Sequence, residues 1–326
     1  MQTFNWGIIG PGRIARKVGA AIDQIRGARV LAIASKSAQD ANQLMRDFSA
    51  ERFYPSYAEL AADPDVDAIY IATPHRFHYE NARMCLLAGK AVLCEKPLTV
   101  NAAQAQDLFA LSREKNVFCM EALWSRFLPV FATAKEWIDS GKIGQVRHVW
   151  SAFGFHVIRN PEGRLLNIEL AGGALLDIGV YNLALTRVFL PGTPEEVLAR
   201  GFIGDTGVDE TISVLMNYAN GAAAQFTCTF QAQTENQMII SGSEGRIIIP
   251  HPFYKSEKAF LISGGKQKKY TARHKVNGYE YQIRAAMGAI RAEEIECPQM
   301  RQVDSLSTMR LMDEIRCQVG LRYPFE

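Results

Sequence analysis

The apolar positions of the first half of the chain follow two alternating periods. Short apolar runs predict strands at 4–9, 30–34, 67–72, 91–94 and 117–120. Between them, apolar residues recur three and four positions apart, which predicts helices at 13–25, 38–48, 57–62, 78–88 and 102–114. Strict alternation of strand and helix is typical of an α/β fold with a doubly wound parallel sheet of the Rossmann kind.

The pattern changes after about residue 120. Helical periodicity predicts helices at 131–140, 175–189, 279–293 and 305–319. Residues 146–155 alternate like a half-exposed strand, and several more strands with turn signals follow between 196 and 249. We therefore expect a dinucleotide-binding domain over 1–121 and a substrate-binding α+β domain over 122–326. The second domain should hold a large, open, mostly antiparallel sheet with one face available for something else.

A glycine-rich turn directly follows the first predicted strand. The run from Gly10 to Ala15 fits G-x-G-x-x-A at the start of a helix. Gly10 permits a tight turn, Gly12 lets the backbone approach a diphosphate, and the small third residue allows close packing of helix and strand. Arg13 and Ile14 then open the helix, whose N–H groups and dipole favour an anion. The context predicts a dinucleotide site rather than a tight turn without a ligand.

The end of the second strand bears on which dinucleotide is bound. An acidic residue there would accept a hydrogen bond from the ribose 2′-hydroxyl of NAD. Here the chain instead has Ser35 and Lys36, which suit a 2′-phosphate, and we expect Arg13 to lie over the adenine or to help bind the phosphate. We expect NADP, with NAD as a possible second cofactor. An exposed loop lysine without a ligand is the alternative for Lys36.

The strand predicted at 67–72 leads to Thr73 and Pro74, which should pass under the ribose and nicotinamide. His75 and His78 have a spacing that metal-binding pairs also use, but no nearby Cys, Asp or Glu completes a ligand set. We expect no metal, and we assign His78 to the cofactor site.

Two segments bring candidate acid–base chemistry. Lys96 follows Glu95 at the carboxyl end of a buried strand, where open α/β sheets bind ligands. Asp177 and Tyr181 are four residues apart on a predicted helix and so share a face. A phenol has a pKa near 10, and a neighbouring ammonium such as Lys96 would lower it toward neutrality. A strand-end ion pair, a helix cap and a half-buried aromatic residue are the non-catalytic alternatives for Lys96, Asp177 and Tyr181.

These segments together give the chain a family resemblance. The fingerprint at 10–15, Glu95-Lys96-Pro97 and the Gly-Gly-x-x-x-Asp-x-Gly segment at 172–179 resemble the glucose–fructose oxidoreductase/inositol dehydrogenase/MocA family. Many members have His where this chain has Tyr181. With the segment 121–127, this departure is similar to the branch of dimeric dihydrodiol dehydrogenases, which also act as NADP-dependent D-xylose dehydrogenases. The resemblance implies Lys96 and Tyr181 as the catalytic pair, Asp177 in support, and a homodimer through the C-terminal sheet. The branch often has a second basic residue beyond Lys36, which 39–41 does not supply.

The first expected substrate is a sugar, an aldopyranose that is oxidised at C1. A trans-dihydrodiol is the second candidate. Aromatic faces suit either ring, although core packing is the alternative for each candidate. The candidate wall residues are Trp124, Arg126, Phe153, Phe155 and His156. Three rival functions stay open: a non-catalytic dinucleotide-sensing regulator, a Cys94 thiolate mechanism, and a family branch that cleaves glycosides with transient use of the nicotinamide.

Bulk composition narrows the class without identifying the reaction. The 326 residues are 48% apolar and 21% charged, with a formal net charge of +2, which gives no case for nucleic acid or an anionic membrane. No signal peptide is evident, and no apolar run suggests a membrane helix. The six cysteines are scattered, which is typical of reduced thiols in a cytoplasmic protein.

Overall fold

The computed structural model describes residues 3–326, without the side chains at 38, 40 and 41. The described chain divides into two compact units. One comprises the chain up to Trp124 together with His274–Leu306, and the other comprises Ser125–Arg273 and Ser307–Glu326. This division differs from the expected single boundary after residue 121, because residues 274–306 belong with the first unit.

The first unit is built on a six-stranded sheet in the order β3-β2-β1-β4-β5-β6, with every pair of neighbours parallel. The strands are β1 (Phe4–Ile9), β2 (Ala28–Ala34), β3 (Arg52–Tyr54), β4 (Ala68–Ile71), β5 (Ala91–Glu95) and β6 (Cys119–Ala122). The prediction of a doubly wound parallel sheet is confirmed. Only β3 lacks a predicted counterpart among these strands, since its three residues are all half-buried and leave no apolar run.

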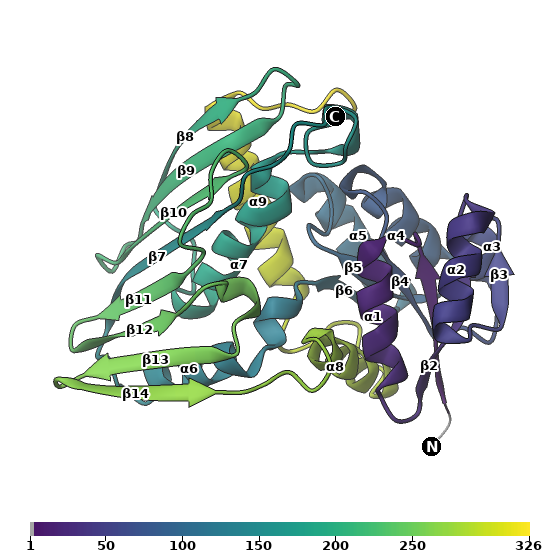
Figure 1. The fold of residues 1–326 in the computed structure, drawn as a ribbon, viewed down its shortest axis with the longest axis horizontal. Helices are drawn as coiled ribbons and strands as arrows, with labels where there is room; N and C mark the ends of the chain where they lie inside the picture. Colours follow the sequence, from purple (N-terminus) through teal and green to yellow (C-terminus); the bar gives the residue numbers. More distant parts are fainter. Residues whose placement is uncertain (1–2) are drawn as a thin grey trace. The chain divides into compact units, whose positions relative to one another are not determined.

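Helices connect these strands as the periodicity predicts (Figure 1). They are α1 (Arg13–Asp23), α2 (Ala38–Phe48), α3 (Tyr57–Ala62), α4 (His78–Leu87) and α5 (Ala102–Lys115). Helix α5 shows why its ends fall where they do. The Asn101 side chain accepts a hydrogen bond from the Gln104 N–H at 3.0 Å, and Asn116 ends the helix in the left-handed conformation with φ 52°.

Residues 274–306 join the first unit through specific polar contacts. They contain α8 (Tyr279–Arg291) and the start of α9 (Gln302–Val319). The Cys119 N–H of edge strand β6 donates to the Ile295 carbonyl at 3.0 Å, and the Asn277 amide donates to the Lys17 carbonyl of α1 at 2.8 Å. An edge strand needs partners for its backbone groups, and this returning segment supplies one for β6.

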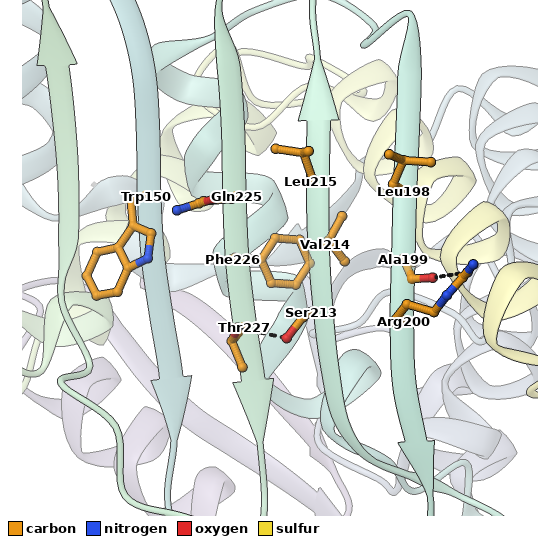
Figure 2. A pocket seen from close by; sticks show the side chains of 10 residues that line it. All are labelled: Trp150, Leu198, Ala199, Arg200, Ser213, Val214, Leu215, Gln225, Phe226 and Thr227. Carbon is orange, nitrogen blue, oxygen red and sulfur yellow. Dashed lines mark hydrogen bonds between the residues drawn. The ribbon is translucent and has the colours of Figure 1, made fainter.

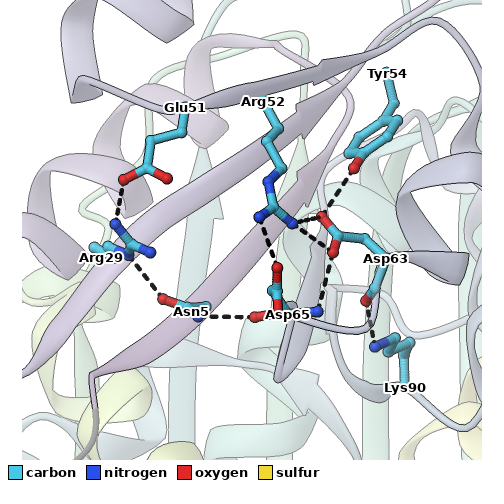
Figure 3. Close-up of polar contacts among 8 residues, drawn as sticks. All are labelled: Asn5, Arg29, Glu51, Arg52, Tyr54, Asp63, Asp65 and Lys90. Carbon is cyan, nitrogen blue, oxygen red and sulfur yellow. Dashed lines mark hydrogen bonds and ion pairs between the residues drawn. The ribbon is translucent and has the colours of Figure 1, made fainter.

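Polar side chains join the amino ends of several strands of this sheet (Figure 3). The buried Asp63 carboxylate accepts hydrogen bonds from Arg52, at 2.7 and 2.9 Å, and from the Tyr54 hydroxyl at 2.9 Å. Asn5 of β1 accepts from Arg29 of β2 at 2.8 Å. These contacts lie at the edge opposite the carboxyl ends of the strands, so they contribute to stability rather than to a ligand site at those ends.

The second unit holds an eight-stranded sheet in the order β14-β13-β12-β11-β7-β10-β9-β8. The strands are β7 (Val146–Gly154), β8 (Glu196–Ile203), β9 (Asp209–Asn217), β10 (Ala223–Thr229), β11 (Met238–Gly242), β12 (Gly245–Ile249), β13 (Lys258–Ser263) and β14 (Lys266–Thr271). Among these described strands, the β7–β10 pair is parallel and the other neighbours are antiparallel. The predicted large, mostly antiparallel sheet is confirmed.

Helices α6 (Pro129–Asp139) and α7 (Val180–Phe189) pack against strands of this sheet, α6 on β13 and β14 and α7 on β7 and β10. The burial pattern of β9 alternates, so that Ile212, Val214 and Met216 are buried while Ser213 and Leu215 are exposed. The sheet therefore has one packed face and one open face.

The helical run Ile168–Phe189 has the length and composition of a membrane span, with a mean hydropathy of 1.4 over its most apolar window. That corrects the expectation that no stretch approaches this length. However, 83% of that window is buried within the protein, which is typical of a core helix.

Candidate active site

The carboxyl ends of β1 and β4 lie at the point where the strand order of the first sheet reverses. Strand β1 has β2 on one side and β4 on the other, and open α/β sheets bind ligands in the crevice at such a point. Gly10, directly after β1, has a φ of +88°, and a Cβ there would lie 2.9 Å from the carbonyl carbon and oxygen of Ala72. The loop after β4 therefore leaves no room for a side chain at residue 10.

Gly12 has the opposite surroundings. It is the N-cap of α1 with φ −74°, and none of the described side chains caps the helix there. No described atom lies within 4 Å of the position that a Cβ on Gly12 would take. An uncapped helix N-terminus beside open space suits the diphosphate of a dinucleotide, so the residues present fit this cofactor.

The end of β2 bears the residues predicted to select the cofactor. Ser35 is buried, and its hydroxyl accepts a hydrogen bond from the Ser37 N–H at 2.9 Å. Lys36 is exposed, as is Arg13 at the start of α1, while Ile14 is half-buried. Ser35 thus shapes the turn, and Lys36 is the residue of this turn with an exposed cationic side chain.

His78 connects the loops that follow β4 and β5. Its ring is fully buried, with Nδ1 2.7 Å from the Pro97 carbonyl oxygen and Nε2 2.8 Å from the Thr73 carbonyl oxygen. The Thr73 hydroxyl accepts from Asn81 at 3.1 Å, and Pro74 is half-buried. His78 therefore holds the loops after β4 and β5 through contacts with their backbone carbonyl groups. Among the described residues, no group of three His, Cys, Asp or Glu side chains could hold a metal ion.

Glu95 orients the backbone of Lys96. The fully buried Tyr70 hydroxyl donates to Glu95 Oε1, and Glu95 Oε2 accepts from the Lys96 N–H at 3.2 Å. Burial, followed by the negative charge of Glu95, raises the pKa of Tyr70 well above 10. The phenol therefore stays protonated and keeps donating to Glu95, while Lys96 itself is half-buried.

Cys94 does not have the surroundings of a nucleophile. It is fully buried in β5, and burial raises the pKa of its thiol well above 9. A buried thiol that stays protonated is normally inert, and this argues against the thiolate alternative.

Asp177 and Tyr181 lie in one helical segment of the second unit. The predicted α-helix over 175–189 begins instead with a π-helical turn, Leu175–Gly179, which contains Asp177, and continues as α7, which contains Tyr181. Such turns are frequent at functional sites. Asp177 is 5% exposed and accepts from Arg164 Nη1 at 2.9 Å. Arg164 lies in a loop whose sequence shows no periodicity, so nothing in the chain's pattern singled it out.

Aromatic rings surround Tyr181. Its ring centroid lies 5.8 Å from that of Phe153 and 5.5 Å from that of Tyr254. Phe153 stacks on Tyr254 at 4.4 Å, and Phe155 lies 5.5 Å from Phe230. Sequence reasoning missed Tyr254, because the turn after β12 carries no periodic signal.

The other predicted wall residues differ in exposure. His156 is exposed, with Nδ1 3.3 Å from the Gln231 carbonyl oxygen, and Arg126 is half-buried. In the first unit, Trp124 is 4% exposed and stacks on Tyr279 with ring centroids 4.3 Å apart. Tyr279 is a second residue that the sequence did not single out.

A groove of about 520 Å³ lies away from these residues, on the open face of the second unit's sheet (Figure 2). Its walls come from β7, β8, β9 and β10, and its exposed side chains include Leu198 and Leu215.

A parallel sheet with a glycine turn at its reversal point is typical of dinucleotide-binding proteins, and here the chain adds a second unit built on an open sheet. Residues 4–123 match the family model described as "Oxidoreductase family, NAD-binding Rossmann fold", and residues 131–248 match the GFO/IDH/MocA C-terminal domain. The chain belongs to this GFO/IDH/MocA oxidoreductase family, as its motifs predict.

Similar proteins span the whole chain. A trans-1,2-dihydrobenzene-1,2-diol dehydrogenase of Xenopus tropicalis is 37% identical, covering 98% of this chain and 99% of its own. The protein of that name from Homo sapiens is 31% identical, with 99% of each chain covered. Among solved structures, a 3-ketoreductase of Actinomadura kijaniata in complex with NADP and TDP-benzene has a TM-score of 0.86, 29% identity and 98% coverage of both chains. An aldose-aldose oxidoreductase of Caulobacter crescentus shares the fold with a TM-score of 0.89, 24% identity and 98% coverage of both chains.

Proposed function

We propose that this protein transfers a hydride between a hydroxyl-bearing carbon of a ring substrate and the nicotinamide of NADP. The ring is an aldopyranose oxidised at C1 or a trans-dihydrodiol. The observation that carries the proposal is the aromatic set around Tyr181, on the segment that also holds Asp177. The name of the relatives at up to 37% identity supports a diol, and the aldose rests on the resemblance of the motifs to the branch that includes D-xylose dehydrogenases.

In this proposal Tyr181 is the general acid/base. It removes the hydroxyl proton during oxidation, and the Lys96 ammonium stabilises the developing phenolate. Asp177, with Arg164 at 2.9 Å, orients the substrate hydroxyl or Lys96. The nicotinamide, when bound, supplies the hydride acceptor. The proposal requires that both units act on one substrate, because Lys96 and Tyr181 belong to different units.

The cofactor assignment rests on the turn after β2. The exposed Lys36 suits a 2′-phosphate, and no acidic residue lies at 35–37. We propose that NADP is preferred and that NAD is accepted more weakly. Gly10, Gly12, Arg13 and Ile14 would bind the diphosphate, while Thr73 and Pro74 would lie under the nicotinamide ribose. His78 and Glu95 would contribute by holding these loops.

The test is cofactor reduction followed by absorbance, with NADP⁺ and NAD⁺ offered separately against a panel of aldoses and a trans-dihydrodiol. Tyr181→Phe should lose about 100-fold or more in kcat, in line with the contribution of a general base. Tyr218→Phe is the matched control, because it removes a phenol hydroxyl that is also buried in the second unit. Equal activity of Tyr181→Phe and wild type would show that another group accepts the proton.

The same assay separates the rival functions. A dinucleotide-sensing regulator would bind the cofactor but turn over none of the substrates. A glycoside-cleaving enzyme would release sugar without accumulating reduced cofactor. Net reduction that depends on Tyr181 excludes both.

We further propose a homodimer through the open face of the second unit's sheet. The groove in Figure 2 has Leu198 at 50% and Leu215 at 37% exposure, beside the polar Gln225 and Ser213. A mixed apolar and polar face of this kind suits contact with a second copy. Leu215→Lys should shift the mass in light scattering from dimer to monomer. An unchanged mass, with Leu198→Lys also unchanged, would place any oligomer contact elsewhere.

A further inference from the structure

Asp209 is a buried acid that the proposed chemistry does not use. It is the first residue of β9 and is fully buried. Its Oδ2 accepts a hydrogen bond from the Leu175 N–H at 2.6 Å, while Oδ1 has no hydrogen-bond partner among the described residues. Burial raises the pKa of Asp209 to about 7, although backbone donors and the positive charge of Arg316 oppose that rise. Keeping such a group in the core is costly, so its position needs an explanation.

Leu175 is the first residue of the turn that holds Asp177, and its N–H is one of the donors that a helix start leaves unsatisfied. Asp209 therefore caps the segment that carries the proposed catalytic residues. The approach is close, because a Cβ at Gly173 (φ +120°) would lie 2.1 Å from Asp209 Oδ1. Glycine at this position lets the carboxylate reach the helix start.

The C-terminal segment also contacts the residues just before this turn. The buried Tyr323 hydroxyl donates to the Gly172 carbonyl at 2.7 Å. Tyr323 is held in turn by Arg316, whose guanidinium lies 5.2 Å from the ring centroid and donates to Glu326 at 2.7 and 3.0 Å. Residues 172–175 are thus fixed by one side chain from β9 and by another from the C-terminal segment.

We propose that Asp209 is a positioning residue for the reaction: together with the Tyr323 hydroxyl, it fixes the helix start that places Asp177 and Tyr181. The inference rests on the proposed function for its catalytic consequence. A general base works only within hydrogen-bond reach of its proton, and a displacement of about 1 Å can cost about 100-fold in rate. Asp209 acts on Tyr181 through the helix and does not itself touch the substrate.

The test compares four variants with wild type. Asp209→Ala removes the acceptor and should lower kcat about 10- to 100-fold, with KM for the dinucleotide unchanged. Asp209→Asn keeps an oxygen that can accept from the Leu175 N–H, so its kcat should stay within about threefold of the wild-type value. Tyr323→Phe removes the hydroxyl that donates to the Gly172 carbonyl but keeps the ring, and it should also lower kcat. Ile212→Val, in the same strand, is the control for a general loss of packing, and its kcat should match wild type even where its melting temperature falls.

Hydrogen exchange supplies a readout that needs no turnover. Amides of residues 174–181 should exchange faster in Asp209→Ala and Tyr323→Phe than in wild type or Ile212→Val. Faster exchange there in an enzyme that turns over no substrate would uphold the positioning role and refute the proposed function. Unchanged exchange, or a kcat for both anchor variants equal to that of Ile212→Val, would overturn the inference. If Asp209→Ala does not fold, Tyr323→Phe and Asp209→Asn carry the same comparison.

Discussion

Gly10 and Gly12 stand two residues apart in one turn, yet the structure predicts opposite consequences for the same substitution. Gly10→Ala should destabilise the fold, because Gly10 has φ +88° and its Cβ would meet backbone atoms of Ala72 at 2.9 Å. Gly12→Ala should leave stability intact and weaken dinucleotide binding, because no described atom lies within 4 Å of its Cβ position. Gly10 is therefore needed for the fold, and Gly12 is needed for binding of the dinucleotide.

The magnitudes follow from these contacts. An alanine in the left-handed region costs about 1–2 kcal/mol, and forcing a methyl group against fixed backbone costs about 1–3 kcal/mol more. Alanine also stiffens the unfolded chain, which offsets about 0.4–1 kcal/mol of this cost, so Gly10→Ala should be destabilised by about 1–5 kcal/mol in total. Gly12 has φ −74°, a value that alanine adopts without strain, so its stability should stay within about 0.5 kcal/mol of wild type.

Thermal unfolding and dinucleotide titration by cofactor fluorescence measure the two effects separately. Gly12→Ala should lose at least about tenfold in affinity, equivalent to about 1.4 kcal/mol, because its methyl group would stand where the diphosphate approaches. Gly27→Ala is a control for a positive-φ glycine, since Gly27 has φ +78° and no described atom within 4 Å of its Cβ position. Unchanged affinity in Gly12→Ala would refute the placement of the diphosphate at this helix start.

Three further predictions concern buried acids and thiols. Burial raises the pKa of Asp63, but hydrogen bonds led by Arg52 outweigh it and hold the pKa below 3.8. This carboxylate therefore stabilises the fold above its unfolded pKa, and the contribution is lost as pH falls through the lower folded value. Asp63→Asn should cost about 1–3 kcal/mol at neutral pH and flatten the loss of melting temperature below pH 4. Glu280 accepts four backbone N–H groups of residues 275–278, at 2.7 to 3.3 Å, so Glu280→Gln, which turns an amide donor toward them, should also cost about 1–3 kcal/mol in denaturant unfolding. Native alkylation followed by mass spectrometry should label the exposed Cys317 before the five buried cysteines and leave activity unchanged; rapid labelling of Cys94 with loss of activity would contradict its burial.

Most of the first unit could be predicted from the sequence, because its strands are buried on both faces. Ile8, Ile33 and Leu93 lie in continuous apolar runs, and such runs identify central parallel strands without any long-range information. The short β3, with half-buried residues throughout, gives no comparable run. The return of residues 274–306 to this unit was also missed, since it depends on a partner for edge strand β6 that lies more than 170 residues along the chain, Cys119 bonding to Ile295.

The residues of the candidate site also include some that the sequence predicts and some that it does not. Gly10 and Gly12 follow from a local motif, because the backbone itself makes the turn. Arg164, Tyr254 and Asp209 were not foreseen, since each meets the Asp177 and Tyr181 segment from a different part of the chain. In sequence, Asp209 looks like a polar strand start after a turn, and nothing local indicates that it is buried beneath a helix.

The cofactor and the substrate are expected to be recognised in different ways, by backbone geometry and by side chains. A dinucleotide presents the same diphosphate to every enzyme that binds it, so a turn fixed by backbone geometry is sufficient to hold it. A ring substrate is recognised by a wall of side chains from separate segments. Here the first two residues of β9 contact both ends of one loop beside Asp177: Asp209 accepts from the Leu175 N–H, and Glu210 lies 3.3 Å from Arg159. Changes in the residues between these anchors would alter the surroundings of Asp177, which Arg164 contacts, while leaving the helix start in place. Under the proposed function, the interior of that loop is therefore one place where the choice between sugar and diol could be made, and the sequence has no periodic pattern there to interpret.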